Sequence, residues 1–263
     1  MPIESRVLWL PKDSGYPEEY EDACAVDLDA GRASIADGVS SAIFSGHWAR
    51  VLTAGAVAAP PDVASPEFWT WLAERRREWS EAIDPSTLTF FQRGKLQQVG
   101  GAFATLLWLE WRSEAERLSW NCTALGDGGM LHVRDGRLLT AFPIGTSDEL
   151  HADPLTVASA QRPADQHLEF RSAEGEARSG DWLILTTDAL LGWALRNYEA
   201  GLSPDWNEFW ELSDEDFAGR VHRWRDDRAI RVDDTTLVML RVTEGEPAGN
   251  SEVRAEIIDD IAD

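Results

Sequence analysis

The sequence of 263 residues has few of the side chains that build soft-metal sites, disulfide frameworks or membrane anchors. It contains two cysteines and five histidines, and none of them stands at the spacing of a zinc site. Cys24 and Cys122 are isolated and flanked by strand-like residues, so we expect reduced core thiols without a function. No apolar run reaches the roughly 18 residues that a membrane span needs. Residues 1–13 lack the basic-then-apolar order of a signal peptide, and we expect a cytoplasmic protein.

Basic residues are also scarce, with 24 Lys and Arg against 47 Asp and Glu and a formal net charge of −23. Repulsion from phosphate backbones and anionic lipids argues against nucleic-acid and membrane-surface partners unless a local basic patch intervenes. The one basic cluster runs from Arg75 to Arg77, beside Glu74 and Glu78. We interpret it as a solvated helix face, with a dock for an acidic phosphoprotein segment as the alternative.

Acidic residues, in contrast, recur in five short segments that each place a carboxylate at the end of an apolar run. Their aspartates are Asp22, Asp37, Asp127, Asp188 and Asp233. Any one of them alone is typical of a turn or a helix N-cap. Together they can gather oxygen ligands at one rim of a sheet, and oxygen is the ligand that Mg²⁺ and Mn²⁺ favour. Two such ions hydrolyse phosphate esters through an activated water, so the pattern predicts phosphoryl chemistry.

The order and wording of these segments resemble the metal-dependent PP2C-type (PPM) serine/threonine protein phosphatases, most clearly the small bacterial members. The resemblance runs from Asp22 to Val242. The matching segments are Glu21-Asp22, Asp37-Gly38, Gly126-Asp127-Gly128, Gly180 to Ala189, and Asp233 to Thr236. The resemblance implies an α-β-β-α sandwich, two Mn²⁺ or Mg²⁺ ions, and single-step hydrolysis of phosphoserine or phosphothreonine without a phosphoenzyme. It also implies a phosphorylated protein as partner, such as a Ser/Thr kinase or its substrate.

The resemblance assigns metal ligands by position. The side chain of Asp37 would bridge both ions and the carbonyl of Gly38 would bind one of them. Asp188 and Asp233 would be further ligands, and with Asp37 they are the expected catalytic residues. Asp127 matches a position linked to a third, weaker ion, although its setting is equally typical of a hairpin start.

Two further acidic residues, Glu21 and Asp22, are expected to hold metal-bound waters rather than to bind metal directly. The lone histidine near this region, His47, is expected to be a packing residue, with proton donor as the alternative.

Several positions depart from the family pattern. Pro17 stands where many relatives carry a phosphate-binding Arg, and Val39 stands where eukaryotic relatives carry a His. Ser40 and Ser41 replace a Gly pair, Ala189 replaces a Gly, and Asp234 occupies a position that is often Asn. These departures permit a competing hypothesis, a PP2C-like regulatory or phosphoprotein-binding module with impaired turnover. A metal-dependent phosphatase of small molecules is a further alternative.

The hydrophobic pattern predicts an α+β fold with helices covering a sandwich of antiparallel sheets. Strands are expected at 5–10, 23–28, 32–36, 102–111, 117–124, 129–134, 137–142, 167–171, 181–187 and 235–242. Helices are expected at 40–54, 66–82, 88–99, 188–200, 204–212 and 214–226. Gly55 is expected to end the first helix, and Ser65 and Ser213 are expected N-caps. Trp69, Trp71 and Trp79 are expected in the core.

The chain is expected to form one domain over 1–242, followed by an acidic tail over 243–263. The tail holds seven acidic residues and one Arg, and we expect it to be disordered. A short amphipathic docking helix at its end is the alternative.

Overall fold

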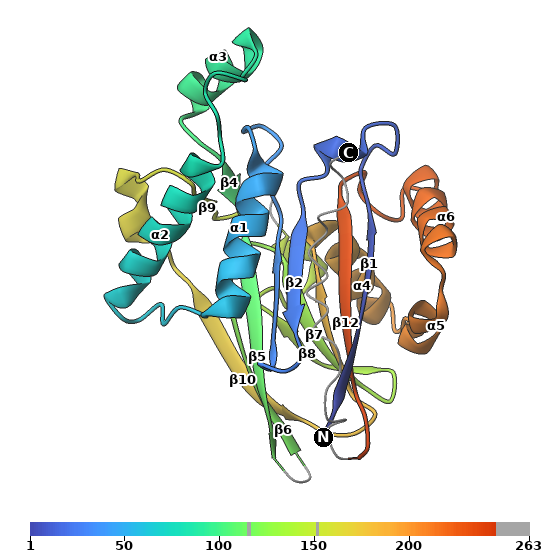
Figure 1. Ribbon diagram of the computed structural model, residues 1–263. Helices are drawn as coiled ribbons and strands as arrows, with labels where there is room; N and C mark the ends of the chain where they lie inside the picture. Colours follow the sequence, from blue (N-terminus) through green and yellow to red (C-terminus); the bar gives the residue numbers. More distant parts are fainter. Residues whose placement is uncertain (115–116, 151–152, 246–263) are drawn as a thin grey trace.

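The structure, a computed structural model, describes residues 1–114, 117–150 and 153–245. Two antiparallel sheets pack face to face, and helices cover both outer faces (Figure 1). The first sheet has the order β1 (Ile3–Leu10), β12 (Thr235–Val242), β11 (Trp182–Thr186), β7 (Gly129–Arg134) and β8 (Arg137–Phe142). The second has the order β10 (Arg171–Ala177), β6 (Arg117–Leu125), β5 (Leu106–Glu114), β3 (Arg32–Ala36) and β2 (Ala23–Asp27). The expected α-β-β-α sandwich is confirmed.

Helices fall into two groups, one for each sheet. The second sheet carries α1 (Ser45–Ala58) and α2 (Glu67–Glu81), and α3 (Phe90–Val99) extends beyond them. The first sheet carries α4 (Asp188–Glu199), α5 (Trp206–Glu211) and α6 (Asp214–Asp226). Short elements complete the fold: the strand pair β4 (Phe103–Ala104) and β9 (Val157–Ala158), and the 3₁₀ turns η1 (Pro17–Glu19), η2 (Ser147–Glu149) and η3 (Pro163–His167).

The core has three layers because the central strands are buried on both faces. In β12, Val238 and Leu240 face the space between the sheets, whereas Leu237 and Met239 pack against the α4–α6 layer. Side chains alternate in this way because successive residues of a strand point to opposite faces. A third cluster, with Trp48 and Leu72, fills the space between the second sheet and α1 and α2. The near-continuous apolar run of β12 is therefore a consequence of two-sided burial.

Most expected elements are present, but the region around 167–171 was wrongly predicted as a strand. Residues 163–167 form η3, and β10 begins only at Arg171. Pro163 fixes φ and lacks an N–H, which suits the start of a turn rather than a sheet ladder. The first helix begins at Ser45, later than expected, because residues 39–44 form a loop after β3.

Gly55 does not end α1, which continues to Ala58. A Cβ at Gly55 would lie 2.5 Å from Cδ of Arg75 on α2, so this glycine allows the two helices to approach. Trp71 and Trp79 are buried as expected, but Trp69 is 46% exposed, which corrects its placement in the core. Ser213 is an N-cap whose hydroxyl accepts a hydrogen bond from the N–H of Asp216, whereas Ser65 lies one residue before the cap position of α2.

Of the three clustered arginines, Arg77 fits the expected solvated face, because its side chain is 70% exposed and pairs with Glu81. Arg75 pairs with Glu78 but is only 20% exposed. Arg76 instead bonds to Asp165 at 2.9 Å, a contact between segments far apart in the sequence. Cys24 and Cys122 are buried and outside any disulfide, as expected. Within the described ranges, no helix is both long and apolar enough to cross a membrane. The tail predicted to be disordered, 243–263, lies outside the described residues from position 246 onward.

Candidate functional site

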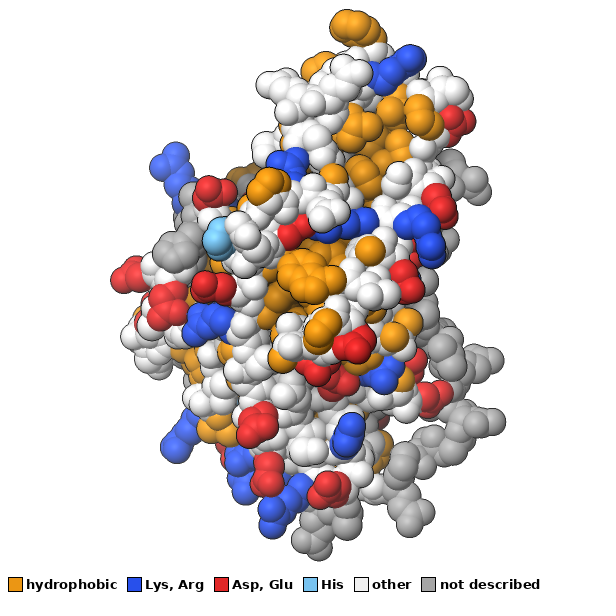
Figure 2. Space-filling view, turned by 90° about the vertical axis from the view of Figure 1, so that its left-hand side faces the viewer, with side chains coloured by type: hydrophobic (Ala, Val, Ile, Leu, Met, Phe, Trp, Pro, Cys, Tyr) orange, Lys and Arg blue, Asp and Glu red, His pale blue; other side chains and the backbone are white. Residues whose placement is uncertain are grey.

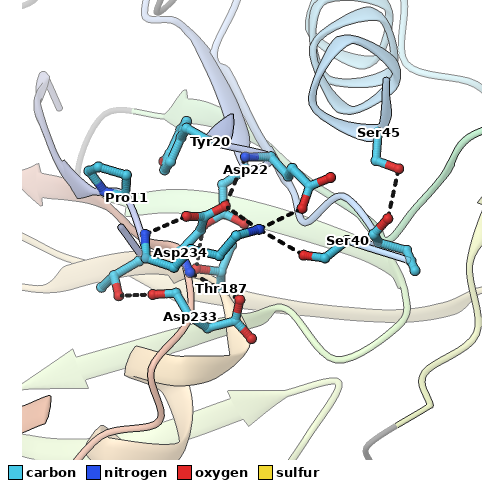
Figure 3. Close-up of polar contacts among 12 residues, drawn as sticks. Pro11, Tyr20, Asp22, Ser40, Ser45, Thr187, Asp233 and Asp234 are labelled. Atoms are coloured by element: carbon cyan, nitrogen blue, oxygen red, sulfur yellow. Dashed lines mark hydrogen bonds and ion pairs between the residues drawn. The ribbon is translucent and has the colours of Figure 1, made fainter. Parts of the chain in front are cut away.

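The five aspartates of the sequence motifs come from loops at strand ends, and the fold brings them together. Asp37 follows β3, Asp22 precedes β2, Asp127 lies between β6 and β7, Asp188 opens α4, and Asp233 precedes β12. Their charges act on one another: burial raises the pKa of Asp37 well above its usual value, and the charges of the other four raise it further. Both sheets thus contribute carboxylates to one acidic site, part of which is shown in Figure 3.

Asp37 is held by its backbone. Its N–H donates to the hydroxyl of Thr105 at 3.0 Å, and its carbonyl accepts from the N–H of Thr105 at 2.9 Å. The next residue, Gly38, donates its N–H to the carbonyl of Glu21 at 3.2 Å. A Cβ at Gly38 would lie 2.7 Å from that same carbonyl oxygen and 2.8 Å from the carbonyl carbon of Ser45. Close backbone contacts therefore require glycine at position 38, whether or not its carbonyl binds a metal ion.

Asp188 and Asp233 share a cation, Arg231. The guanidinium of Arg231 bonds to Oδ2 of Asp188 and donates to Oδ2 of Asp233 at 2.8 Å. Oδ1 of Asp188 is buried without a hydrogen-bond partner among the described residues. Burial raises the pKa of Asp188, the Arg231 charge opposes this, and the Asp233 charge adds to it. Sequence reasoning missed Arg231, although it stands two residues before the Asp233 motif.

Asp127 is the most isolated carboxylate of the site. Its side chain is buried, and neither of its oxygens has a hydrogen-bond partner in the part of the chain that the structure describes. Burial, followed by the charge of Asp188, raises the pKa of Asp127 to about 7. Buried polar atoms are almost always paired in native proteins, so this carboxylate calls for a partner of positive charge.

Asp22 is buried in a network of hydroxyl groups. Its Oδ2 accepts hydrogen bonds from Thr187 at 2.9 Å and from Thr236 at 2.7 Å. The hydroxyl of Tyr20 bonds in turn to that of Thr236. Burial and then the charge of Asp234 raise the pKa of Asp22 well above its usual value. Asp22 therefore joins the segments of β2, β11 and β12, and Figure 3 shows it beside Asp234 and Thr187, a place compatible with its predicted role of holding waters.

Glu21 and Asp234 both contact Lys12, which the motifs did not indicate. Nζ of Lys12 lies 2.7 Å from Oε2 of Glu21, 2.8 Å from Oγ of Ser40 and 3.9 Å from Oδ2 of Asp234. Asp234 also accepts from the backbone N–H groups of Lys12, at 2.6 Å, and Glu21, at 2.8 Å. Asp234 thus fixes the backbone of two segments, and Lys12 is the cation beside them.

Arg225 supports the Asp233 loop from α6. It donates to the carbonyls of Pro11, at 2.9 Å, and Asp233, at 2.6 Å. His47, expected to be a packing residue with proton donor as the alternative, lies on α1, and its Nε2 is buried without a partner within the described residues. Burial and the charge of Arg50 lower the pKa of His47, which favours the neutral ring.

The donor set suits a hard cation. Among the residues that the structure describes, no three His, Cys, Asp or Glu side chains are placed so that they could hold a metal ion. Even so, Asp37, Asp127 and Asp188 offer only oxygen, their pKa values are raised, and buried oxygens of Asp127 and Asp188 have no partner in the described chain. Carboxylate oxygen is the kind of ligand that Mg²⁺ and Mn²⁺ favour, so the chemistry of these side chains is compatible with such an ion.

Comparison with known proteins bears on the fold. No family model and no curated protein matches the sequence. Among solved structures, PppA, a regulatory component of the T6SS in Pseudomonas aeruginosa, matches with 19% identity over 92% of this chain and 98% of that chain, at a TM-score of 0.53. The PPM Ser-Thr phosphatase MsPP from Mycobacterium smegmatis matches with 16% identity over 93% and 99%, at a TM-score of 0.50. The chain has the PP2C-type fold.

A third structure with this PP2C-type fold is the catalytic domain of the serine/threonine phosphatase PstP in complex with two manganese ions. It is 16% identical over 92% of this chain and 99% of that chain, at a TM-score of 0.51. Identities this low establish the PP2C-type fold alone.

Proposed function

We propose that this protein is a metal-dependent phosphoserine/phosphothreonine protein phosphatase. One observation carries the proposal: in a PP2C-type sandwich, the charges of Asp37, Asp127 and Asp188 act on one another and the pKa values of all three are raised. Buried carboxylate oxygens without partners in the described chain accompany them. Burying like charges together is costly unless positive charge balances them. The neighbours that are named as Ser/Thr phosphatases support the assignment.

In this proposal Asp37, the carbonyl of Gly38, Asp188 and Asp233 would hold two Mn²⁺ or Mg²⁺ ions, with Asp127 at a possible third. Such ions supply a hydroxide near neutral pH and neutralise phosphate oxygens.

The chain's own residues would position these groups and the substrate. Asp22 fixes Thr187 and Thr236 and leaves its Oδ1 free to accept from a water, because that atom has no partner among the residues described. Gly38 gives the backbone its close approach to Glu21, which keeps the β3 loop beside η1. Lys12 places an ammonium beside the carboxylates, where it would attract an anionic phosphoryl group.

A second candidate is the PP2C-like module with impaired turnover. It is favoured by Arg231, whose guanidinium already neutralises Asp188 and Asp233. A protein that keeps this ion pair would retain the fold and a phosphoprotein-binding surface without efficient hydrolysis.

The two candidates are separated by hydrolysis of p-nitrophenyl phosphate with Mn²⁺, Mg²⁺ or EDTA, alongside Asp37→Ala and Asp188→Ala. The phosphatase predicts metal-dependent turnover that both variants lose. The impaired module predicts Mn²⁺ binding by calorimetry without turnover. If the protein shows neither Mn²⁺ binding nor turnover, the acidic residues are only structural.

A further inference from the structure

Helix α3 is unusual because it projects from the body of the molecule. Figure 1 shows it beyond the end of the sandwich, and each of its residues is exposed or half-buried. Its ends are stabilised locally: Thr89 and Gln92 form a capping box, and Gly100 closes the helix in the left-handed conformation. Local capping therefore supports the helix, and Leu96 packs it against the hydrophobic cluster under α1 and α2.

This projecting helix carries the two most exposed large hydrophobic side chains of the described chain. Phe90 is 93% exposed and Phe91 is 76% exposed. Figure 2 shows hydrophobic side chains gathered at this end of the molecule, at the top of the view. Adjacent exposed phenylalanines on a capped helix are typical of a binding surface, because aromatic side chains are enriched at interfaces.

A groove leads from α3 to Lys12 and Glu21, which lie beside the acidic site. It has a volume of about 560 Å³ and lies between η1, the start of α1 and α3. At its outer end it is lined by Phe91 and Lys95, and Nζ of Lys95 lies 3.3 Å from the carbonyl of Ser40. At its inner end, Lys12 reaches to 3.9 Å from Asp234. The groove therefore runs from Lys12 and Glu21, next to Asp234, to Phe91 on α3, whose chain neighbour is Phe90.

We propose that this groove, with Phe90 and Phe91, docks the segment of a protein substrate that flanks its phosphorylated residue, and that it selects an apolar side chain there. The inference rests on the proposed function, because that function places the phosphate at the acidic site. A chain entering with its phosphate beside Lys12 passes Lys95 and reaches the phenylalanines of α3.

Charge complementarity favours this occupant. In a chain of net charge −23, Lys12, Arg50 and Lys95 bring three cations to a groove that Glu18, Glu19 and Glu21 also line, so the groove does not share the acid excess of the whole chain. A phosphorylated segment is attracted to such positions, and the apolar rings are left for its neighbouring side chain.

The size of the apolar surface argues against a second copy of this chain as the occupant. Two phenylalanine side chains offer about 300–500 Å². A stable interface between proteins buries about 800 Å² on each partner. A short peptide segment matches the smaller area.

The test compares Phe90→Ala/Phe91→Ala with a matched control, Leu202→Ala, which removes a 59% exposed apolar side chain in the turn after α4. Two labelled peptides serve as probes, Ala-Ala-Phe-pSer-Phe-Ala-Ala and Ala-Ala-Ser-pSer-Ser-Ala-Ala. Fluorescence anisotropy measures binding to the full chain with Mn²⁺, and p-nitrophenyl phosphate turnover is measured in parallel. Circular dichroism checks the fold of each variant.

We expect the wild type and the control to bind the Phe-flanked peptide at least tenfold more tightly than the Ser-flanked one. The double variant should lose this preference while its turnover of p-nitrophenyl phosphate is unchanged. Equal binding of both peptides by the wild type overturns the docking proposal even if turnover is intact. If the wild type prefers the Phe-flanked peptide but neither it nor any variant hydrolyses p-nitrophenyl phosphate, the proposed phosphatase activity is overturned and the docking proposal is supported. A wild-type dimer that the double variant converts to monomer assigns α3 to self-association and also overturns the proposal.

Discussion

Two aspartates at opposite ends of strand β11 are both buried, yet their environments are opposite. Asp181, just before the strand, accepts from Nε and Nη2 of Arg134 at 2.7 and 2.6 Å, and His132 Nε2 lies at 2.8 Å. Asp188, just after it, keeps Oδ1 without a partner in the described residues. Burial acts to raise both pKa values, but at Asp181 the hydrogen bonds outweigh it and the pKa falls well below its usual value.

The difference separates a structural carboxylate from a candidate functional one. Asp181 also accepts from the backbone N–H of Arg178 at 3.0 Å, so the protein itself satisfies its charge. At the acidic site, by contrast, buried oxygens of Asp127 and Asp188 have no hydrogen-bond partner among the residues that the structure describes. Burial alone therefore does not indicate a functional aspartate, whereas burial with unmet hydrogen bonding makes an aspartate a candidate.

The largest effect on activity is expected when a carboxylate of the acidic site is neutralised. Asp37→Asn should lower Mn²⁺-dependent hydrolysis of p-nitrophenyl phosphate by at least about a thousandfold, because the bridging ligand is lost. The free energy of unfolding without metal should stay the same or rise by about 1 kcal/mol, since like-charge repulsion is relieved. Activity assays and urea unfolding in EDTA measure both. Wild-type activity in this variant would show that Asp37 is not part of the catalytic site.

The converse change is Asp181→Asn at the other end of β11. It should lower the free energy of unfolding by about 3 kcal/mol, because Arg134 and His132 lose the buried carboxylate that they contact. Metal-dependent turnover of the remaining folded protein should be close to wild type. Urea unfolding with activity in the folded baseline tests this. A loss of less than 0.5 kcal/mol would contradict the structural role of Asp181, taking about that value as the usual limit for neutral surface changes.

The sequence predicts this contrast only in part. Alternating and two-sided apolar strands give the sandwich, and the motif order indicates which aspartates meet, since strand ends fix where a loop begins. The partners of those aspartates depend on loop conformation and on contacts across long separations. Arg231, Lys12 and the pairing of Arg76 with Asp165 carry no periodic signal, and so they were not predictable. The metal-binding and catalytic roles of the acidic residues stay predictions.

The dependence of the unfolding free energy on pH tests the structural role of Asp181 independently. The pKa of Asp181 is lower in the folded protein than the usual unfolded value of about 3.9. Its stabilisation is therefore complete above about pH 5 and is lost as the pH falls through and below 4 toward the folded pKa. The difference in unfolding free energy between wild type and Asp181→Asn should be constant from pH 5 to 7 and should shrink below pH 4. Urea titrations at each pH measure it, and a difference that grows with acid would reverse the sign of the argument.

The smallest expected effect concerns the cation that the acidic end already has. Arg231→Ala removes the guanidinium that contacts Asp188 and Asp233, so a divalent ion no longer competes with it for those oxygens. Half-exposed ion pairs each contribute up to about 1 kcal/mol, so Mn²⁺ affinity by calorimetry should rise about three- to tenfold. The matched control is Arg117→Ala, whose partner Glu176 lies at the edge of the second sheet, and it should not change Mn²⁺ affinity. A fall in affinity would mean that Arg231 organises the carboxylates for the metal. Arg231 would then hold Asp188 and Asp233 in the arrangement that binds the metal, rather than compete with the metal for their oxygens.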